Sequence, residues 1–148
     1  VNQLQRLHLV EKIKSYFNGH LKGRHFALWG IAFKPNTDDI REAPSLYMID
    51  ELLKLGAIVQ AFDPEAMANV KQVVGDKIKF AETQYEALEK ADALLIATEW
   101  NEFRTPDFNK IGQLLNSKVI FDGRNLFDIA TMEQLGYHYE SIGRKSIN

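Results

Sequence analysis

The sequence predicts one α/β domain of the doubly wound, Rossmann-like kind, with a parallel sheet, helices on both faces and a preceding N-terminal helix. Two observations predict this fold. Short apolar runs alternate with amphipathic stretches at a spacing typical of strand–helix–strand units. The run 93–97 (ALLIA) is apolar throughout, as expected for a strand buried on both faces of a parallel sheet.

The first 17 residues predict a helix. Apolar side chains recur there every three or four residues and so share one face: Leu4, Leu7, Val10, Ile13 and Phe17. Asn18-Gly19 follows as a stop signal. If this helix belongs to a larger protein, we expect its apolar stripe to be partly exposed in the isolated chain, which would favour self-association.

Strands and helices alternate in the rest of the prediction. Strands are expected at 25–29, 57–62, 78–81, 93–97, 118–121 and 137–142. Helices are expected at 44–55, 65–74, 85–90, 107–115 and 131–135. Pro44 suits the first turn of its helix and Gly56 suits the end of the same helix. No repeat or linker divides the chain, which is long enough for one domain with a sizeable core.

Composition excludes several classes of function. The net charge is −2 and basic residues are scattered among acidic ones, so we expect no nucleic-acid partner. No apolar run approaches the length of a membrane span, and the start at Val1 has no signal-peptide pattern. Without cysteines there is no thiolate, and the four histidines lack metal-ligand spacing. A cytoplasmic protein without a metal site is expected, and a processed start or a fragment would explain Val1.

The loop after the first expected strand is the first candidate site. A self-contained dinucleotide fold would place a glycine-rich phosphate loop here, yet only Gly30 remains. NAD binding by this loop is therefore not expected. Phe33 and Lys34 instead offer an aromatic or backbone surface beside one cation, which suits the base or the phosphate of a nucleotide.

A dense polar cluster follows in the same loop. Asp38 and Asp39 are expected to cap backbone amides and to pair with Arg41, holding the loop closed. For Lys34 and Arg41 the spacing leaves two interpretations open, ligand binding or structural pairing.

The turn after the fifth strand is the second candidate. Gly123 permits a sharp turn that brings Arg124 to the carboxyl edge of the sheet, where a guanidinium can bind a phosphate or a carbonyl. The structural alternative is a surface pair of Arg124 with Asp122 or Asp128.

Three further positions have weaker claims. An acid at Asp63 would bind ribose in a dinucleotide fold, but without the glycine pattern a turn-forming role is favoured. Trp29 is interpreted as core, and Trp100 as a packed or interface residue within 98–101 (TEWN). No Ser-His-Asp arrangement or isolated carboxylate pair stands out.

These loops carry a family resemblance. Residues 26–45 (FALWGIAFKPNTDDIREAPS) strongly resemble the opening of the C-terminal domain in the UDP-glucose/GDP-mannose dehydrogenase family. Four further motifs follow in the family's order: Ala61-Phe62-Asp63-Pro64, Ala91-Asp92-Ala93, Ala97-Thr98-Glu99-Trp100 and Phe121-Asp122-Gly123-Arg124-Asn125. The match spans about 22–143 and looks most similar to the UDP-glucose branch.

The resemblance implies a division of labour between domains. In this family an N-terminal domain binds NAD, a helical middle forms the dimer, and the C-terminal domain binds the nucleotide end of the sugar. The sugar C6 alcohol becomes a carboxylate in two hydride transfers to NAD, through a covalent cysteine intermediate. Residues 1–20 would be the tail of the helical middle, and 21–148 the UDP-sugar-binding domain.

Roles transfer by resemblance to four residues. Phe33, Lys34 and Arg124 match substrate-binding positions, and Arg41 matches an arginine that reaches the NAD. The expected partners are a UDP-sugar, the protein's own N-terminal and central domains, and further copies in a homo-oligomer. Because this chain has no cysteine, it is not expected to be catalytic alone. The alternative is a free-standing nucleotide-binding or interaction module.

Overall fold

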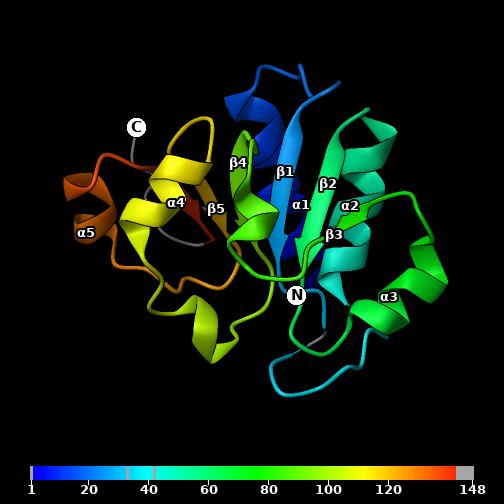
Figure 1. Cartoon of the computed structure of the whole chain (residues 1–148). Helices are drawn as coiled ribbons and strands as arrows, with labels where there is room; N and C mark the ends of the chain where they lie inside the picture. Colours follow the sequence, from blue (N-terminus) through cyan, green and yellow to red (C-terminus); the bar gives the residue numbers. More distant parts are fainter. Residues whose placement is uncertain (1, 33, 42, 143–148) are drawn as a thin grey trace.

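A computed structural model describes residues 2–32, 34–41 and 43–142, with side chains from Leu9 onward. Its centre is a six-stranded sheet with the order β3-β2-β1-β4-β5-β6, and every neighbouring pair is parallel (Figure 1). The strands are β1 (His25–Trp29), β2 (Ile58–Phe62), β3 (Lys79–Phe80), β4 (Ala93–Ile96), β5 (Val119–Asp122) and β6 (His138–Ser141). The predicted doubly wound fold is confirmed.

Helices and short 3₁₀ turns connect the strands. They are α1 (Asn2–Tyr16), α2 (Pro44–Lys54), α3 (Met67–Val74), η1 (Glu86–Leu88), η2 (Asn101–Phe103), α4 (Phe108–Leu114) and α5 (Ile129–Gln134). Figure 1 shows α1 and α2 behind the sheet and α4 in front of it. Within the described ranges, no helix is both long enough and apolar enough to cross a membrane.

The sheet core follows from the apolar runs. All four residues of β4 are buried, as are the last four of β1, because both strands lie in the middle of the sheet with helices on either side. Trp29 is fully buried, stacks on Phe103 at 5.0 Å between ring centroids, and donates its indole N–H to the Gln84 carbonyl at 2.7 Å. The interpretation of Trp29 as a core residue is confirmed.

Helix α1 packs against the sheet through its apolar stripe. Leu9, Val10, Ile13 and Phe17 are all buried, and the helix contacts α2 and β5. The expected exposure of the stripe is therefore wrong for its three described members, Val10, Ile13 and Phe17, which the rest of the chain covers. Leu4 and Leu7 lie outside the described side chains.

Most element boundaries differ from the sequence prediction by one or two residues, and carboxylate hydrogen bonds account for two of the differences: a turn before α3 and a side-chain cap on α5. α3 begins at Met67 instead of 65 because the Asp63 carboxylate binds the amides of Glu65 and Ala66. α5 begins at Ile129 instead of 131 because the Asp128 carboxylate accepts from the amide of Thr131. The helix expected at 85–90 is the short 3₁₀ turn η1, and η2 was not predicted.

Candidate functional site

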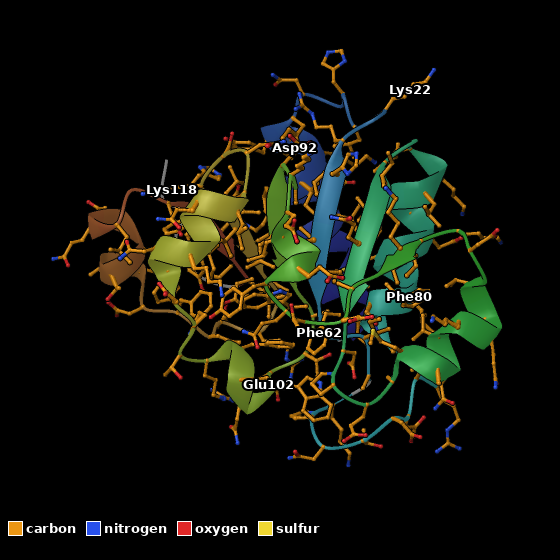
Figure 2. All side chains as sticks on the ribbon, in the orientation of Figure 1. Lys22, Phe62, Phe80, Asp92, Glu102 and Lys118 are labelled. Carbon is orange, nitrogen blue, oxygen red and sulfur yellow. The ribbon has the colours of Figure 1, made fainter. Side chains whose placement is uncertain are left out.

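The carboxyl edge of the sheet is the place where this fold binds ligands. β1 lies between β2 and β4, so the chain leaves β1 on one side and returns on the other, and a crevice is expected where the connections diverge. The segments after β1, β2, β4 and β5 meet at this edge. In Figure 2, Phe62 and Glu102 mark it, while Lys22 and Asp92 mark the opposite, amino edge.

Asp63 fixes the root of the first two segments. Its carboxylate is 1% exposed and accepts four backbone N–H groups. Oδ2 binds the amides of Ile31 and Ala32 at 2.7 and 2.9 Å. Oδ1 binds the amides of Glu65 and Ala66 at 2.9 and 2.8 Å. The turn-forming role predicted for Asp63 is confirmed, and all four bonds are internal rather than directed to a ribose.

Gly30 and Thr98 fill the space between β1 and β4. Gly30 has φ +91°, and a Cβ at this position would lie 2.6 Å from Cβ of Thr98, so only glycine fits. The Thr98 hydroxyl donates to the carbonyl of Ala32 at 2.7 Å. Where dinucleotide folds hold a pyrophosphate on free loop amides, this chain places an internal carboxylate and a threonine. The amides of Ile31 and Ala32 are therefore already occupied within the chain.

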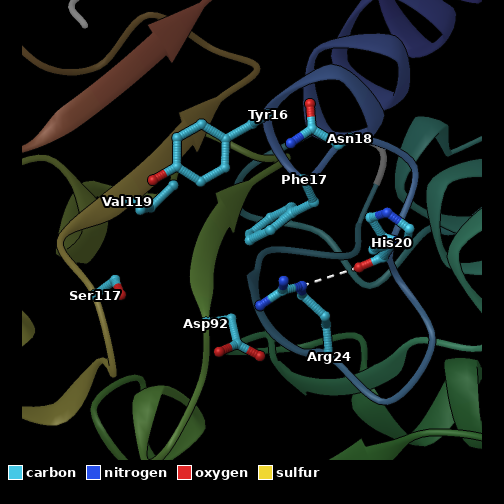
Figure 3. Close-up of a pocket in the computed structure, with 8 residues that line it drawn as sticks. All are labelled: Tyr16, Phe17, Asn18, His20, Arg24, Asp92, Ser117 and Val119. Atoms are coloured by element: carbon cyan, nitrogen blue, oxygen red, sulfur yellow. Dashed lines mark hydrogen bonds between the residues drawn. The ribbon is translucent and has the colours of Figure 1, made fainter.

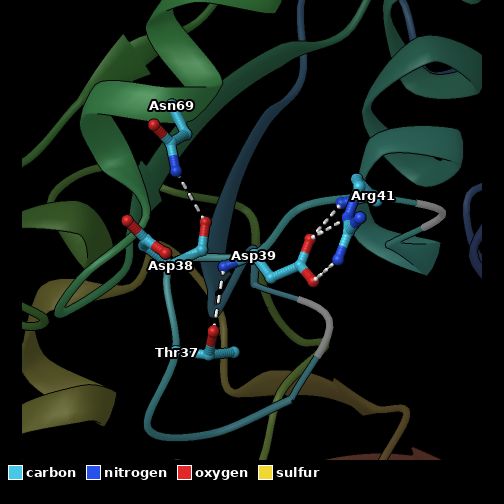
Figure 4. A network of polar contacts seen from close by, with 5 residues as sticks. All are labelled: Thr37, Asp38, Asp39, Arg41 and Asn69. Atoms are coloured by element: carbon cyan, nitrogen blue, oxygen red, sulfur yellow. Dashed lines mark hydrogen bonds and ion pairs between the residues drawn. The ribbon is translucent and has the colours of Figure 1, made fainter.

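The tip of that loop carries an exposed ion pair (Figure 4). The Arg41 guanidinium donates to both carboxylate oxygens of Asp39, from Nε at 3.1 Å and from Nη2 at 2.9 Å, and the Arg41 amide donates to Oδ1 at 3.0 Å. These hydrogen bonds, helped by the nearby charge of Lys34, lower the pKa of Asp39 to about 2. The predicted pairing of Asp39 with Arg41 is confirmed.

The same tip is tied to a neighbouring helix. Asn69 of α3 donates its side-chain amide to the carbonyl of Asp38 at 2.8 Å (Figure 4). Lys34 is exposed, and Phe33 lies outside the described residues. Of the two interpretations left open for Arg41, the structure displays structural pairing, and a contact with ligand stays a prediction.

A buried carboxylate organises the turn after β5. Asp122 is fully buried and accepts from the amides of Arg124 at 2.8 Å and Leu126 at 2.7 Å, and from the Tyr139 hydroxyl at 2.7 Å. Gly123 brings this turn against β4: its amide donates to the carbonyl of Ile96 at 2.8 Å, and a Cβ there would lie 3.0 Å from the same oxygen. The backbone of this turn is thus fixed by Asp122 and by the contact of Gly123 with β4, independently of the Arg124 side chain.

The side chain of Arg124 is held by Glu99, three residues beyond β4. Nε and Nη2 of Arg124 donate to the same oxygen, Oε2, at 2.9 and 2.5 Å. The structural alternative named Asp122 or Asp128 as the partner, and sequence reasoning missed Glu99, which is 25 residues away. The available signal was topological, because adjacent parallel strands β4 and β5 deliver their following segments to the same place.

A hollow of about 460 Å³ opens at this edge. Its lining comes from the segments after β1, β2 and β4: Asn36, Thr37, Asp38, Glu65 and Trp100. Trp100 is buried, as expected for a packed aromatic, and its indole nitrogen has no hydrogen-bond partner among the described residues. With Asp38 and Glu65 as the charged groups in the lining, the hollow does not favour a phosphate.

A second hollow, of about 360 Å³, lies at the amino edge (Figure 3). Arg24 crosses it, donating from Nε to the carbonyl of His20 at 2.9 Å, with its guanidinium 4.5 Å from the Phe17 ring centroid. Asp92 accepts from the amide of His25 at 2.9 Å. These contacts join the end of α1 to the strands, so we interpret this hollow as a structural joint.

The strand order and the internal contacts of the first loop define a Rossmann-like domain in which Asp63 binds the amides of Ile31 and Ala32. Within the described part of the chain, no group of acidic or histidine side chains could hold a metal ion. Residues 27–129 match the UDP binding domain of the UDP-glucose/GDP-mannose dehydrogenase family, and the chain belongs to this family.

Similar proteins agree with this assignment. UDP-glucose 6-dehydrogenase of Pseudomonas aeruginosa is 45% identical over 97% of this chain and 33% of its own length. TuaD, a UDP-glucose 6-dehydrogenase of Bacillus subtilis, is 42% identical over 99% of this chain and 32% of its own length. The structure of a UDP-glucose dehydrogenase from Pyrobaculum islandicum superposes with a TM-score of 0.77 at 31% identity, covering 93% of this chain and 29% of that one. The chain spans about a third of the length of the curated relatives it matches.

Proposed function

We propose that the chain is the substrate-nucleotide-binding domain of an NAD-dependent UDP-glucose 6-dehydrogenase. The proposed reaction of the intact enzyme converts UDP-glucose to UDP-glucuronate in two hydride transfers, with NAD as the hydride acceptor. Support comes from the two UDP-glucose 6-dehydrogenases that align with nearly the whole chain at 45% and 42% identity.

One observation carries the assignment of this chain to the substrate rather than to the cofactor. The loop amides of Ile31 and Ala32, which would face a pyrophosphate in a dinucleotide fold, are bound by the buried Asp63 carboxylate. NAD must then be held mainly by another part of the protein. Because the chain also has no cysteine for a covalent intermediate, it is not catalytic alone.

Four side chains carry the proposed contacts. Lys34, Arg124 and the sequence neighbour Phe33 would bind the nucleotide sugar, and Arg41, whose side chain is 88% exposed, would reach NAD held by the N-terminal domain. Fixing the nucleotide end supplies binding energy that orients the distant C6 alcohol for reaction.

The proposed context is a larger cytoplasmic protein. Residues 1–20 would be the tail of a central helical region, although the described apolar side chains of α1 pack against the sheet, and 21–148 would be the UDP-sugar-binding domain. Its partners would be the protein's own N-terminal and central domains and further copies in a homo-oligomer.

NMR titration of the chain tests this function. UDP and UDP-glucose should bind weakly, because half of an enclosing cleft is absent, and should shift the amides of Lys34 and Arg124. Lys34→Ala should weaken UDP binding about fivefold, through loss of one charge contact with phosphate. The matched control is Lys22→Ala, an exposed lysine at the amino edge, which should bind as the unmodified chain does (Figure 2). Larger amide shifts with NAD than with UDP would contradict the proposal.

A further inference from the structure

The pairing of Arg124 with Glu99 is more constrained than an ordinary surface ion pair. The two side chains are 35% and 22% exposed, and two N–H groups of the arginine converge on one carboxylate oxygen. Exposed pairs contribute little because both side chains must be ordered for the contact. Here the fold has already ordered the backbone on both sides of the pair.

Three contacts set the distance between the partners. Asp122 fixes the Arg124 amide, and the Gly123 amide binds the Ile96 carbonyl at the end of β4. Thr98, next to Glu99, is buried and bound to the Ala32 carbonyl. The backbone therefore presents Glu99 and Arg124 to each other, and the carboxylate selects one orientation of the guanidinium.

The pair also changes what Arg124 can recognise. A carboxylate at 2.5–2.9 Å largely offsets the guanidinium charge, so a phosphate approaching the pair meets little net attraction. Among the described residues, this guanidinium donates hydrogen bonds only to Glu99, from Nε and Nη2. The Nη1 group therefore remains available to a ligand. An N–H donor whose direction is fixed, on a guanidinium whose charge is compensated by a carboxylate, suits an uncharged oxygen acceptor.

We propose that Glu99 is a positioning residue, which holds Arg124 so that its remaining N–H groups bind an uncharged oxygen of the nucleotide sugar, a hydroxyl or a carbonyl. The ligand part of this inference rests on the proposed function. The positioning part is a statement about two side chains of this chain, and it is testable without ligand.

The ligand-free test follows the arginine Nε–H signals by ¹⁵N NMR. The Arg124 signal, assigned with Arg124→Lys, should exchange with water about tenfold more slowly than that of Arg104, which is exposed. Glu99→Ala should remove this protection, whereas Glu99→Gln, which keeps an acceptor oxygen, should keep most of it. The control Glu102→Gln removes a nearby exposed carboxylate and should change nothing. Equal exchange of Arg124 and Arg104 in the unmodified chain would overturn the positioning role.

The ligand test measures UDP-glucose affinity in the same variants. Glu99→Ala should bind about tenfold more weakly, Glu99→Gln within about twofold, and the double variant Glu99→Ala/Arg124→Ala no more weakly than Arg124→Ala. Unfolding midpoints should stay unchanged for the Glu99 variants, which a purely structural role would not allow. Tighter binding by Glu99→Ala would mean that Glu99 competes with the ligand, and would overturn the proposal.

Salt dependence tests the uncharged acceptor. The double variant Glu99→Ala/Arg124→Ala removes both charges of the pair. Relative to the unmodified chain it should lose the same factor in affinity at about 20 mM and about 200 mM NaCl, because screening does not act on a neutral partner. A loss of affinity that occurs only at low salt would indicate that Arg124 binds a phosphate, and would overturn the proposal of an uncharged acceptor. If the unmodified chain binds no UDP-glucose, the proposed function fails in this chain, and the Nε–H exchange still decides the positioning by Glu99.

Discussion

The loop after β1 and the turn after β5 both present an arginine paired with a carboxylate, but the two pairs are supported differently. Arg124 stands on a turn whose Asp122 is fully buried and accepts three hydrogen bonds. Arg41 pairs with Asp39, two residues away, and both side chains are substantially exposed. The fold thus fixes the turn that carries Arg124, whereas Arg41 pairs with a carboxylate of its own loop.

This difference suits two different tasks. A fixed arginine can bind a ligand that reaches the same place each time, at little cost in conformational entropy. An arginine in an exposed pair can exchange its partner when another domain approaches, because a surface pair is weak. The first loop itself is divided in the same way: Asp63 and Gly30 fix its root, and the Asp39–Arg41 pair lies at its tip.

The largest effect is expected for removal of the buried carboxylate. Asp122→Ala leaves two backbone amides without their side-chain acceptor and removes the nearer acceptor of the Tyr139 hydroxyl, which should lower the free energy of unfolding by about 4 kcal/mol. Asp39→Ala, the matched change in the exposed pair, should lower the urea midpoint only slightly, because an exposed pair contributes little. Denaturation followed by circular dichroism measures both, and similar losses in the two variants would contradict the comparison.

A smaller effect tests the root of the first loop. Gly30→Ala combines a left-handed backbone with a Cβ 2.6 Å from Thr98, and should cost about 3 kcal/mol. Gly136→Ala is the control: φ is +82° but nothing lies within 4 Å of the added Cβ, so only the backbone cost of about 1 kcal/mol is expected. Equal losses of unfolding free energy in Gly30→Ala and Gly136→Ala would show that Thr98 moves aside and that the root of the loop is not tightly packed.

The fold was predictable because its main signals are local. Apolar runs such as 93–97 mark central strands, and periodic stripes mark helices, since burial on both faces of a parallel sheet leaves no polar alternation. The misplaced helix starts depended on short-range contacts, of Asp63 with Ala66 and of Asp128 with Thr131, whose geometry decides where each helix begins. The covered stripe of α1 likewise needed the sheet as its partner.

The candidate site was predictable only where its contacts are short in sequence. Asp39 and Arg41 are two residues apart, so their pairing followed from composition and spacing. Glu99 and Arg124 are separated by a helix and a strand, and neither residue type nor spacing relates them. Their contact arises because β4 and β5 are neighbours in the sheet, and that strand order becomes known only when the whole sheet is assembled.

The smallest effect is a titration at the exposed pair. Hydrogen bonds from Arg41 hold the pKa of Asp39 at about 2, against an ordinary value of 3.8. Because the folded-state pKa is the lower one, the pair's stabilising effect is present above about pH 4 and is lost as the pH falls towards 2. Arg41→Ala removes the side-chain hydrogen bonds and keeps the backbone one, so it should raise the Asp39 pKa, followed by carboxyl ¹³C NMR, part of the way towards 3.8.

Lys34→Ala should raise the Asp39 pKa by a smaller amount, because Lys34 acts through charge alone, and Lys22→Ala at the opposite edge should leave it unchanged. An Asp39 midpoint near 3.8 in the unmodified chain would mean that the pair does not persist in solution. The contrast with the pair of Arg124 and Glu99, which stands on a turn fixed by Asp122, would then be sharper.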